Sequence, residues 1–233
     1  MKISYILIGI IFLMATIASG NAFATPMQNS YFMNLGNVKF IACKTENGKI
    51  HFGSGVIIGK NRIITANHVI YNAKKCMVDN HEVSIVSQYP EMDFAVLSVD
   101  LGENPAITPI SCDGFKNGET YFSLGFSYAA DFAMTKLKAT ENFMDAAEKP
   151  ESYPFPTNHL QILSGLAFSG MSGGPIIDMD GRIVGITNMS NEGSMVASRS
   201  LDETPLCSAL VQIKPAVSKS QFDKLDNFLK NLK

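Results

Sequence analysis

The hexapeptide Gly170-Met171-Ser172-Gly173-Gly174-Pro175 places one hydroxyl among three glycines in a chain of 233 residues. Glycines on both sides of a serine let the backbone approach a reacting carbonyl and adopt conformations that other residues resist. A glycine-rich turn with an incidental serine is the alternative interpretation. A serine hydroxyl is a poor nucleophile unless a base takes its proton. The order of the histidines and aspartates around this serine therefore decides between the two interpretations and selects the fold.

All four histidines precede the serine: His51, His68, His81 and His159. The hexapeptide also matches G-x-S-x-G, the nucleophile motif of the α/β-hydrolase fold, but that fold needs its histidine after the serine and is excluded. The subtilisin order needs an aspartate before the histidine, and no aspartate precedes either His51 or His68. The order that remains is histidine, then aspartate, then serine.

Within that order, the local sequence selects a base and a carboxylate. His68 comes just after residues 63–66, which have the pattern of a buried strand whose rigid end would hold an imidazole. The other three histidines have turn or loop neighbours and are interpreted as surface residues. Asp93 begins the apolar run 94–97, and a lone carboxylate there would be costly to bury without a strong hydrogen-bond partner. His68, Asp93 and Ser172 are therefore the candidate base, carboxylate and nucleophile.

Short apolar runs separated by turn residues indicate the fold class. Asn47-Gly48 and Asp180-Gly181 each separate two such runs, and these dipeptides supply the positive φ angles that tight hairpins demand. No helical segment of 10–15 residues comes between the runs. Many short strands at this spacing favour antiparallel barrels or a sandwich.

Two segments depart from this strand pattern. From residue 218 to 232 the apolar side chains fall on one helical face, which predicts a helix docked on the body of the protein. They are Phe222, Leu225, Phe228, Leu229 and Leu232. Residues 141–156 are acidic and contain three prolines, so a long surface loop is expected there.

Composition and charge exclude some classes of function. Hydrophobic residues make up 46% of the chain, enough to bury a core, and the formal net charge is −2. A nucleic-acid-binding protein needs a basic face or stripe, which this balance does not provide. The length predicts one globular unit with room for two subdomains.

The N-terminus has the pattern of an export signal. Lys2, the apolar run 3–18 and the small-residue site Ala22-Phe23-Ala24 are typical of a signal peptide, cleaved so that the mature chain begins near Thr25. An uncleaved membrane anchor is the competing interpretation. No other stretch approaches transmembrane length, so no membrane association is expected after the signal is removed.

Four cysteines lie beyond the signal: Cys43, Cys76, Cys112 and Cys207. An even number in an oxidising compartment favours two disulfides, and the residues alone leave all three pairings open. A zinc site from Cys43, His51, Cys76 and His81 is the alternative, but no C-x-x-C pair supports it, and no metal is predicted.

Around the candidate base, carboxylate and nucleophile, the chain resembles the trypsin/chymotrypsin-like serine peptidases, in particular their bacterial V8-like secreted branch. The matching motifs are G-S-G at 53–55, T-A-N-H at 65–68, D-F-A-V-L at 93–97 and G-M-S-G-G-P at 170–175. The resemblance implies an all-β fold of two packed antiparallel six-stranded barrels with a C-terminal helix. The expected organisation is a signal peptide (1–24), an N-terminal barrel with the histidine and aspartate (25–112), a C-terminal barrel with the serine (113–217) and the helix (218–233).

The resemblance also implies a mechanism. Ser172 would attack the peptide carbonyl, His68 would take its proton, and Asp93 would orient the imidazole. The N–H groups of Gly170 and Ser172 would bind the oxyanion. The expected protein is a monomeric secreted endopeptidase that acts on proteins or peptides without a cofactor. A catalytically inert binding module of the same fold is the alternative.

Other family features map onto single positions. Met171 stands where many animal relatives carry the aspartate of the zymogen switch, so the site is expected to form on folding. Asn188 stands where the family has a serine that touches the catalytic aspartate.

The expected walls of the substrate pocket favour a small or apolar P1 side chain; they are Leu166, Ala167, Thr187, Asn188 and Met189. The resemblance further implies disulfides between Cys43 and Cys76 and between Cys112 and Cys207.

Overall fold

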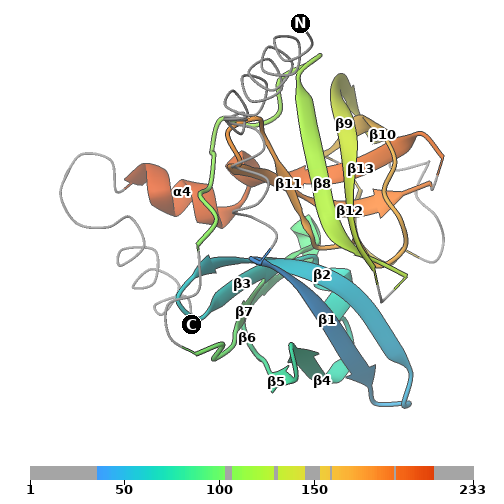
Figure 1. Cartoon of the computed structure of the whole chain (residues 1–233), viewed down its shortest axis with the longest axis vertical. Coiled ribbons are helices and arrows are strands. Elements are labelled where there is room, and N and C mark those ends of the chain that lie inside the picture. The colour runs from blue at the N-terminus through green and yellow to red at the C-terminus, as the bar shows by residue number, and fades with distance from the viewer. Residues whose placement is uncertain are drawn as a thin grey trace, which may run out of the picture.

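The computed structural model describes residues 36–102, 107–128, 131–144, 153–157, 159–191 and 193–212. The predicted signal peptide and the predicted helix at 218–233 lie outside these ranges. In the described ranges β-strands dominate and form two groups. In Figure 1 strands β1 to β7 lie in the lower part of the view and strands β8 to β13 in the upper part. These groups fall inside the predicted units 25–112 and 113–217, whose boundaries stay predictions. No helix in these ranges has the length and apolar character needed to cross a membrane.

The N-terminal group is a seven-stranded antiparallel sheet in the order β5-β4-β1-β2-β3-β7-β6. The strands are β1 Val38–Thr45, β2 Ile50–Gly59, β3 Arg62–Thr65, β4 Ala73–Val78, β5 His81–Glu82, β6 Ser84–Tyr89 and β7 Phe94–Ser98. The short helix α3, Asn67–Ile70, follows β3.

The C-terminal group is a closed barrel in the order β10-β13-β12-β11-β8-β9. Its strands are β8 Thr120–Ser127, β9 Asp131–Phe143, β10 Leu160–Gly165, β11 Pro175–Ile177, β12 Ile183–Ser190 and β13 Met195–Ser200. A 3₁₀ turn, Leu201–Glu203, and helix α4, Pro205–Gln212, follow.

The prediction of two six-stranded barrels is correct for the second half and wrong for the first. The extra strand β5 has only two residues, and it reverses from β4 at Asp79 and Asn80, which both have positive φ. The sheet order ends at β5 and β6, and no pairing between these two strands closes it within the described residues.

One hydrophobic cluster spans both halves of the described structure. It contains Ile57, Ile63 and Leu97 from the N-terminal sheet together with Leu124 and Ile186 from the barrel. Strand β2 is therefore buried from its fourth residue to its end. One of its faces packs on side chains of the N-terminal half and the other on the barrel. This packing holds the N-terminal sheet against the barrel through β1 and β2, which contact β8, and both halves contribute residues to the candidate site.

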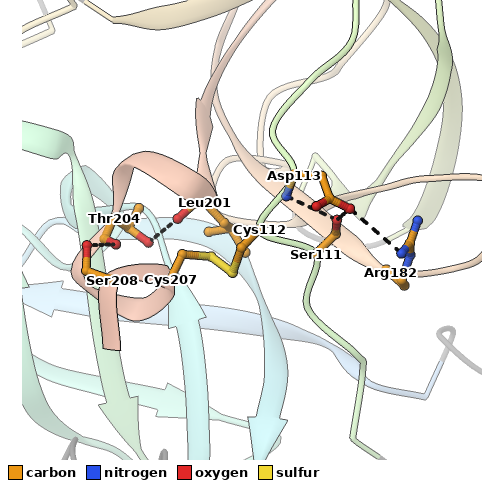
Figure 2. The surroundings of a disulfide bond; sticks show 8 residues. All are labelled: Ser111, Cys112, Asp113, Arg182, Leu201, Thr204, Cys207 and Ser208. Atoms are coloured by element: carbon orange, nitrogen blue, oxygen red, sulfur yellow. Dashed lines mark hydrogen bonds and ion pairs between the residues drawn. A yellow bond between two sulfur atoms is a disulfide. The ribbon is translucent and has the colours of Figure 1, made fainter. Parts of the chain in front are cut away.

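The two disulfides join the pairs that the resemblance implied. Cys43 and Cys76 lie opposite each other in the register of β1 and β4. Cys112, in the segment between the halves, is bonded to Cys207 of α4. Figure 2 shows this second disulfide holding α4 beside Ser111 and Asp113. Because Cys43 and Cys76 are bonded to each other, the zinc alternative is excluded.

Two further features differ from the sequence prediction. Helix α4 was not predicted, since eight residues show too little periodicity to separate it from a loop. The surface loop expected at 141–156 is only partly correct. Its first three residues end β9, and Tyr153 and Phe155 are buried because their rings pack on residues of the N-terminal half.

Candidate active site

Asp93 is the fully buried centre of a hydrogen-bonded cluster. It ends the 3₁₀ turn Pro90–Met92 and precedes β7, with a left-handed backbone (φ 47°, ψ 50°). Its Oδ1 accepts the backbone N–H of His68 at 2.7 Å, and its Oδ2 lies 2.7 Å from His68 Nδ1. The buried carboxylate thus has the strong partner that its sequence position required.

His68 is held on the same carboxylate by its backbone and its ring. It lies in α3, directly after β3, and its side chain is 21% exposed. Because Nδ1 faces Asp93, the ring orientation is fixed and Nε2 is the nitrogen left for proton transfer with another group.

Asn188 of β12 supplies a further contact to the carboxylate. Its Nδ2 donates to Asp93 Oδ2 at 2.8 Å and to the Asp93 carbonyl at 2.9 Å. The Arg199 N–H donates to Asn188 Oδ1 at 2.7 Å, which settles which end of the amide faces Asp93. The resemblance implied a contact to the aspartate from position 188, where the usual residue is a serine.

Tyr153 is the residue that sequence analysis missed. Its hydroxyl also donates to Asp93 Oδ2, and it comes from the segment interpreted as a surface loop. An aromatic residue between prolines gave no local signal for this contact. The two residues are 60 positions apart in sequence, and folding brings them together.

The electrostatics of Asp93 combine opposing effects. Burial raises the pKa of Asp93, but the attraction of His68 and the hydrogen bonds from His68, Tyr153 and Asn188 outweigh it, so the pKa is lowered below its usual value. The carboxylate is therefore ionised at neutral pH. Burial and the adjacent carboxylate raise the pKa of Tyr153, so its hydroxyl stays protonated.

The loop that carries Ser172 is fixed against β2 and β3. The Ser172 carbonyl accepts the Ser54 N–H at 2.7 Å, and the Gly173 N–H donates to the Thr187 carbonyl at 2.7 Å. A Cβ atom on Gly173 would lie 2.1 Å from Thr65 Oγ1, so only glycine permits this approach. The nucleophile candidate thus sits beside the strand that leads to His68.

The structure links the three candidates to different degrees. His68 and Asp93 are bonded directly, and Ser172 Oγ lies 3.5 Å from the carbonyl oxygen of Asn188, the residue that also binds Asp93. Among the described residues, no hydrogen bond joins the Ser172 hydroxyl to the His68 ring. Hydrogen bonds of this kind are often long before substrate is bound.

The two candidate oxyanion donors point away from internal partners. In the described part of the chain, neither the N–H of Gly170 nor that of Ser172 donates to another group. Gly170 has φ 96°, and the Ser169 carbonyl before it accepts the Tyr128 N–H at 2.7 Å. Two free N–H groups two residues apart are suited to an anionic oxygen.

The five candidate pocket residues occupy different environments. Ala167 and Thr187 are buried, and the Thr187 hydroxyl is 2.8 Å from that of Ser123. Leu166 is 40% exposed, whereas Met189 packs on a separate cluster with Leu160. None of the five, including Asn188, lines the open groove of about 930 Å³ that borders His68, Tyr71 and Tyr153.

No group of three or more His, Cys, Asp or Glu side chains is arranged to hold a metal ion in the described ranges.

The chain is similar to known serine peptidases. The family described as "Trypsin-like peptidase domain" matches residues 53–186. A probable periplasmic serine endoprotease, DegP-like, of Pseudomonas fulva is 30% identical over 143 residues, which is 58% of this chain and 28% of the relative. The serine protease Do-like HtrA of Bacillus subtilis is 30% identical over 199 residues, 77% of this chain and 42% of the relative. The chain thus spans less than half the length of these relatives.

Solved structures share the fold. The active form of the Rv3671c protease from M. tuberculosis has a TM-score of 0.64 at 20% identity and covers 82% of this chain and 87% of its own. The HtrA-type protease AlgW with a tripeptide has a TM-score of 0.63 at 23% identity, covering 80% and 62%.

Proposed function

Because the chain belongs to the trypsin-like peptidase domain family, we propose that it is a serine endopeptidase in which Ser172 is the nucleophile, His68 the general base and Asp93 the orienting carboxylate. The observation that carries this proposal is the double hydrogen bond from His68 to a fully buried Asp93. A carboxylate held this way fixes the tautomer of the imidazole and stabilises the imidazolium that forms during catalysis.

The reaction proceeds in two halves. His68 Nε2 takes the Ser172 hydroxyl proton as Oγ attacks the scissile carbonyl, and His68 then gives that proton to the leaving amine. Water hydrolyses the acyl-enzyme by the reverse proton transfers. The free N–H groups of Gly170 and Ser172 support a role in binding the oxyanion; losing one such donor typically costs about 100- to 1000-fold in rate.

The substrates are proteins or peptides under this proposal. The names of the DegP-like and HtrA relatives, endoprotease and protease, support that substrate class. The P1 preference stays an expectation for small or apolar side chains, from Leu166, Ala167, Thr187, Asn188 and Met189. The V8-like branch likewise stays a prediction, since the relatives reported above are of HtrA, DegP-like and Rv3671c type.

Export to the periplasm or the medium is also part of the proposal. Two disulfides support it, because such bonds persist in oxidising compartments. The signal-like residues 1–24 and the periplasmic DegP-like relative support it as well.

Labelling with a fluorophosphonate probe tests the proposed chemistry. The wild-type protein should be labelled on Ser172, and Ser172→Ala should not. Ser164→Ala is a matched control because Ser164 is an exposed serine of the same barrel. Absence of labelling in wild-type protein with an intact β-sheet circular dichroism spectrum would favour the inert binding module.

A further inference from the structure

Three donors converge on one oxygen of Asp93. Oδ2 faces His68 Nδ1 at 2.7 Å and Asn188 Nδ2 at 2.8 Å, and it also accepts the hydroxyl of Tyr153. An ionised carboxylate only accepts hydrogen bonds, so the tyrosine is the donor. Tyr153 is 8% exposed, and this contact therefore forms away from water.

The ring of Tyr153 also contacts the imidazole. The centroids of the Tyr153 and His68 rings are 5.5 Å apart in an edge-to-face arrangement with an interplanar angle of 62°. Edge-to-face pairs of this kind contribute about 0.5–1.5 kcal/mol beyond the area they bury. One side chain thus touches both the base and its carboxylate.

Residues 153–157, here called the strap, are anchored on the element that carries His68. The Phe155 ring packs edge-to-face on Tyr153 at 6.0 Å and on Tyr71 at 5.1 Å. Tyr71 is the residue that ends α3, and Phe155 is buried. Movement of the strap relative to α3 would therefore break aromatic contacts.

We propose that Tyr153 is a positioning residue of the proposed active site, which holds the Asp93 carboxylate by its hydroxyl and the His68 ring by its edge. This inference rests on the proposed function. Asn188, which stands where the resemblance has a serine, and Tyr153 then both donate to the carboxylate.

The Tyr153 hydroxyl also reduces the negative charge on Asp93 Oδ2. A hydrogen bond from Tyr153 draws negative charge from Oδ2 and weakens its attraction for a protonated imidazole. Among the described residues, the charged or titratable groups beside Tyr153 are Asp93, His68 and Arg199, and Arg199 is paired with Glu203 at 2.9 Å. Burial is the largest cause that raises the pKa of Tyr153, and the neighbouring Asp93 carboxylate raises it further. The hydroxyl therefore stays protonated across the pH range of the labelling assay.

The test compares Tyr153→Phe with Tyr121→Phe. Both changes remove one hydroxyl from a buried tyrosine, but the Tyr121 hydroxyl binds the backbone N–H of Lys116, at 2.9 Å, outside the site. The rate of fluorophosphonate labelling is measured against pH. Tyr153→Phe should label about 10- to 100-fold more slowly, the cost of a hydrogen bond to a charged group, with the acid limb of its profile moved to higher pH. Tyr121→Phe should retain the wild-type rate and profile.

A second readout separates this inference from the proposed function. The downfield proton resonance of His68 Nδ1–H reports its bond to Asp93 whether or not Ser172 reacts. Tyr153→Phe should shift this resonance, and Phe155→Leu, which loosens the strap but keeps the hydroxyl, should shift it less. An unchanged resonance in folded Tyr153→Phe protein overturns the positioning role. Unlabelled wild type with a resonance that does respond overturns only the peptidase proposal.

Discussion

The Ser54 hydroxyl donates a 2.8 Å hydrogen bond to the carbonyl of Gly170, across the boundary between the two halves of the protein. The same hydroxyl accepts the Phe126 N–H at 2.8 Å and is fully buried. On the other side of Gly170, the Ser169 carbonyl is held by Tyr128. Because a trans peptide points its C=O and N–H in opposite directions, the bond to the Ser169 carbonyl fixes where the Gly170 N–H points. The bond from Ser54 fixes the next peptide plane, so Gly170 is held on both sides.

Ser54→Ala should therefore weaken the proposed oxyanion site. The change leaves the Gly170 carbonyl and the Phe126 N–H without a partner, at a cost of about 1–3 kcal/mol in the free energy of unfolding. We expect a fall in kcat of about 10-fold or more with KM nearly unchanged, measured on a peptide substrate. Ser198→Ala removes a comparable buried bond, to the Ile186 carbonyl at 2.7 Å, and should lower stability without that fall in kcat. Equal kcat values for the two variants would contradict this role.

Gly173→Ala should be incompatible with the native loop. A Cβ at this position would lie 2.1 Å from Thr65 Oγ1 and 2.3 Å from the Ser54 carbonyl oxygen, at φ +81°. Gly118 has φ +80° with nothing within 4 Å, so Gly118→Ala isolates the cost of the backbone conformation, about 1–2 kcal/mol. Denaturant unfolding should show a larger loss for Gly173→Ala, together with loss of labelling on Ser172. Similar losses for both variants would show that the close approach is unimportant.

Asn188→Asp should oppose the ionised Asp93 with a second buried carboxylate. It replaces the donor at 2.8 Å by a like charge, and an uncompensated buried charge costs about 3–5 kcal/mol. Repulsion raises the pKa of the new acid, so the loss of stability should be largest at neutral pH and shrink as pH falls and the acid is protonated. Asn188→Ser is the control, since its hydroxyl carries no charge. Thermal unfolding across pH checks this, and a loss independent of pH would argue against the electrostatic cause.

Asp93 itself should give the wild-type protein an acid-sensitive stability. Its pKa is lowered in the folded state, so its contribution is complete above the unfolded value of about 3.9 and is lost as pH falls through the lower folded pKa. Asp93→Asn should lack this component and lose stability less steeply in that range. In comparable triads the same change lowers kcat by about 10⁴-fold. Parallel stability curves for the two proteins in acid would refute this assignment.

The disulfide between Cys112 and Cys207 should stabilise the fold more than that between Cys43 and Cys76. The residues of the first pair are 95 apart in sequence and those of the second 33, and the loop-entropy relation gives the longer loop about 1 kcal/mol more. Double Cys→Ser variants of each pair, compared by denaturant unfolding, measure the difference. Titration of the unreduced protein should find no free thiols. A larger loss of stability on removing the Cys43–Cys76 bond would contradict the loop-entropy explanation.

The candidate residues for the chemistry could be identified from the order of amino acids alone. The order of His68, Asp93 and Ser172 along the chain excluded two other catalytic folds, and the turn dipeptides predicted the hairpins that the structure contains at Gly48 and Gly181. These signals are local or depend only on order, so they survive without coordinates.

How those residues are held became known from the packing of the folded chain. The bonds from Tyr153 and Asn188 to Asp93 join positions 60 and 95 apart, and the bond from Ser54 to Gly170 joins positions 116 apart. Such contacts depend on how two β-sheets pack against each other, which hydrophobic alternation along single strands does not specify. For the same reason the closure of the second sheet, and the open order of the first, became visible only when the strands were paired.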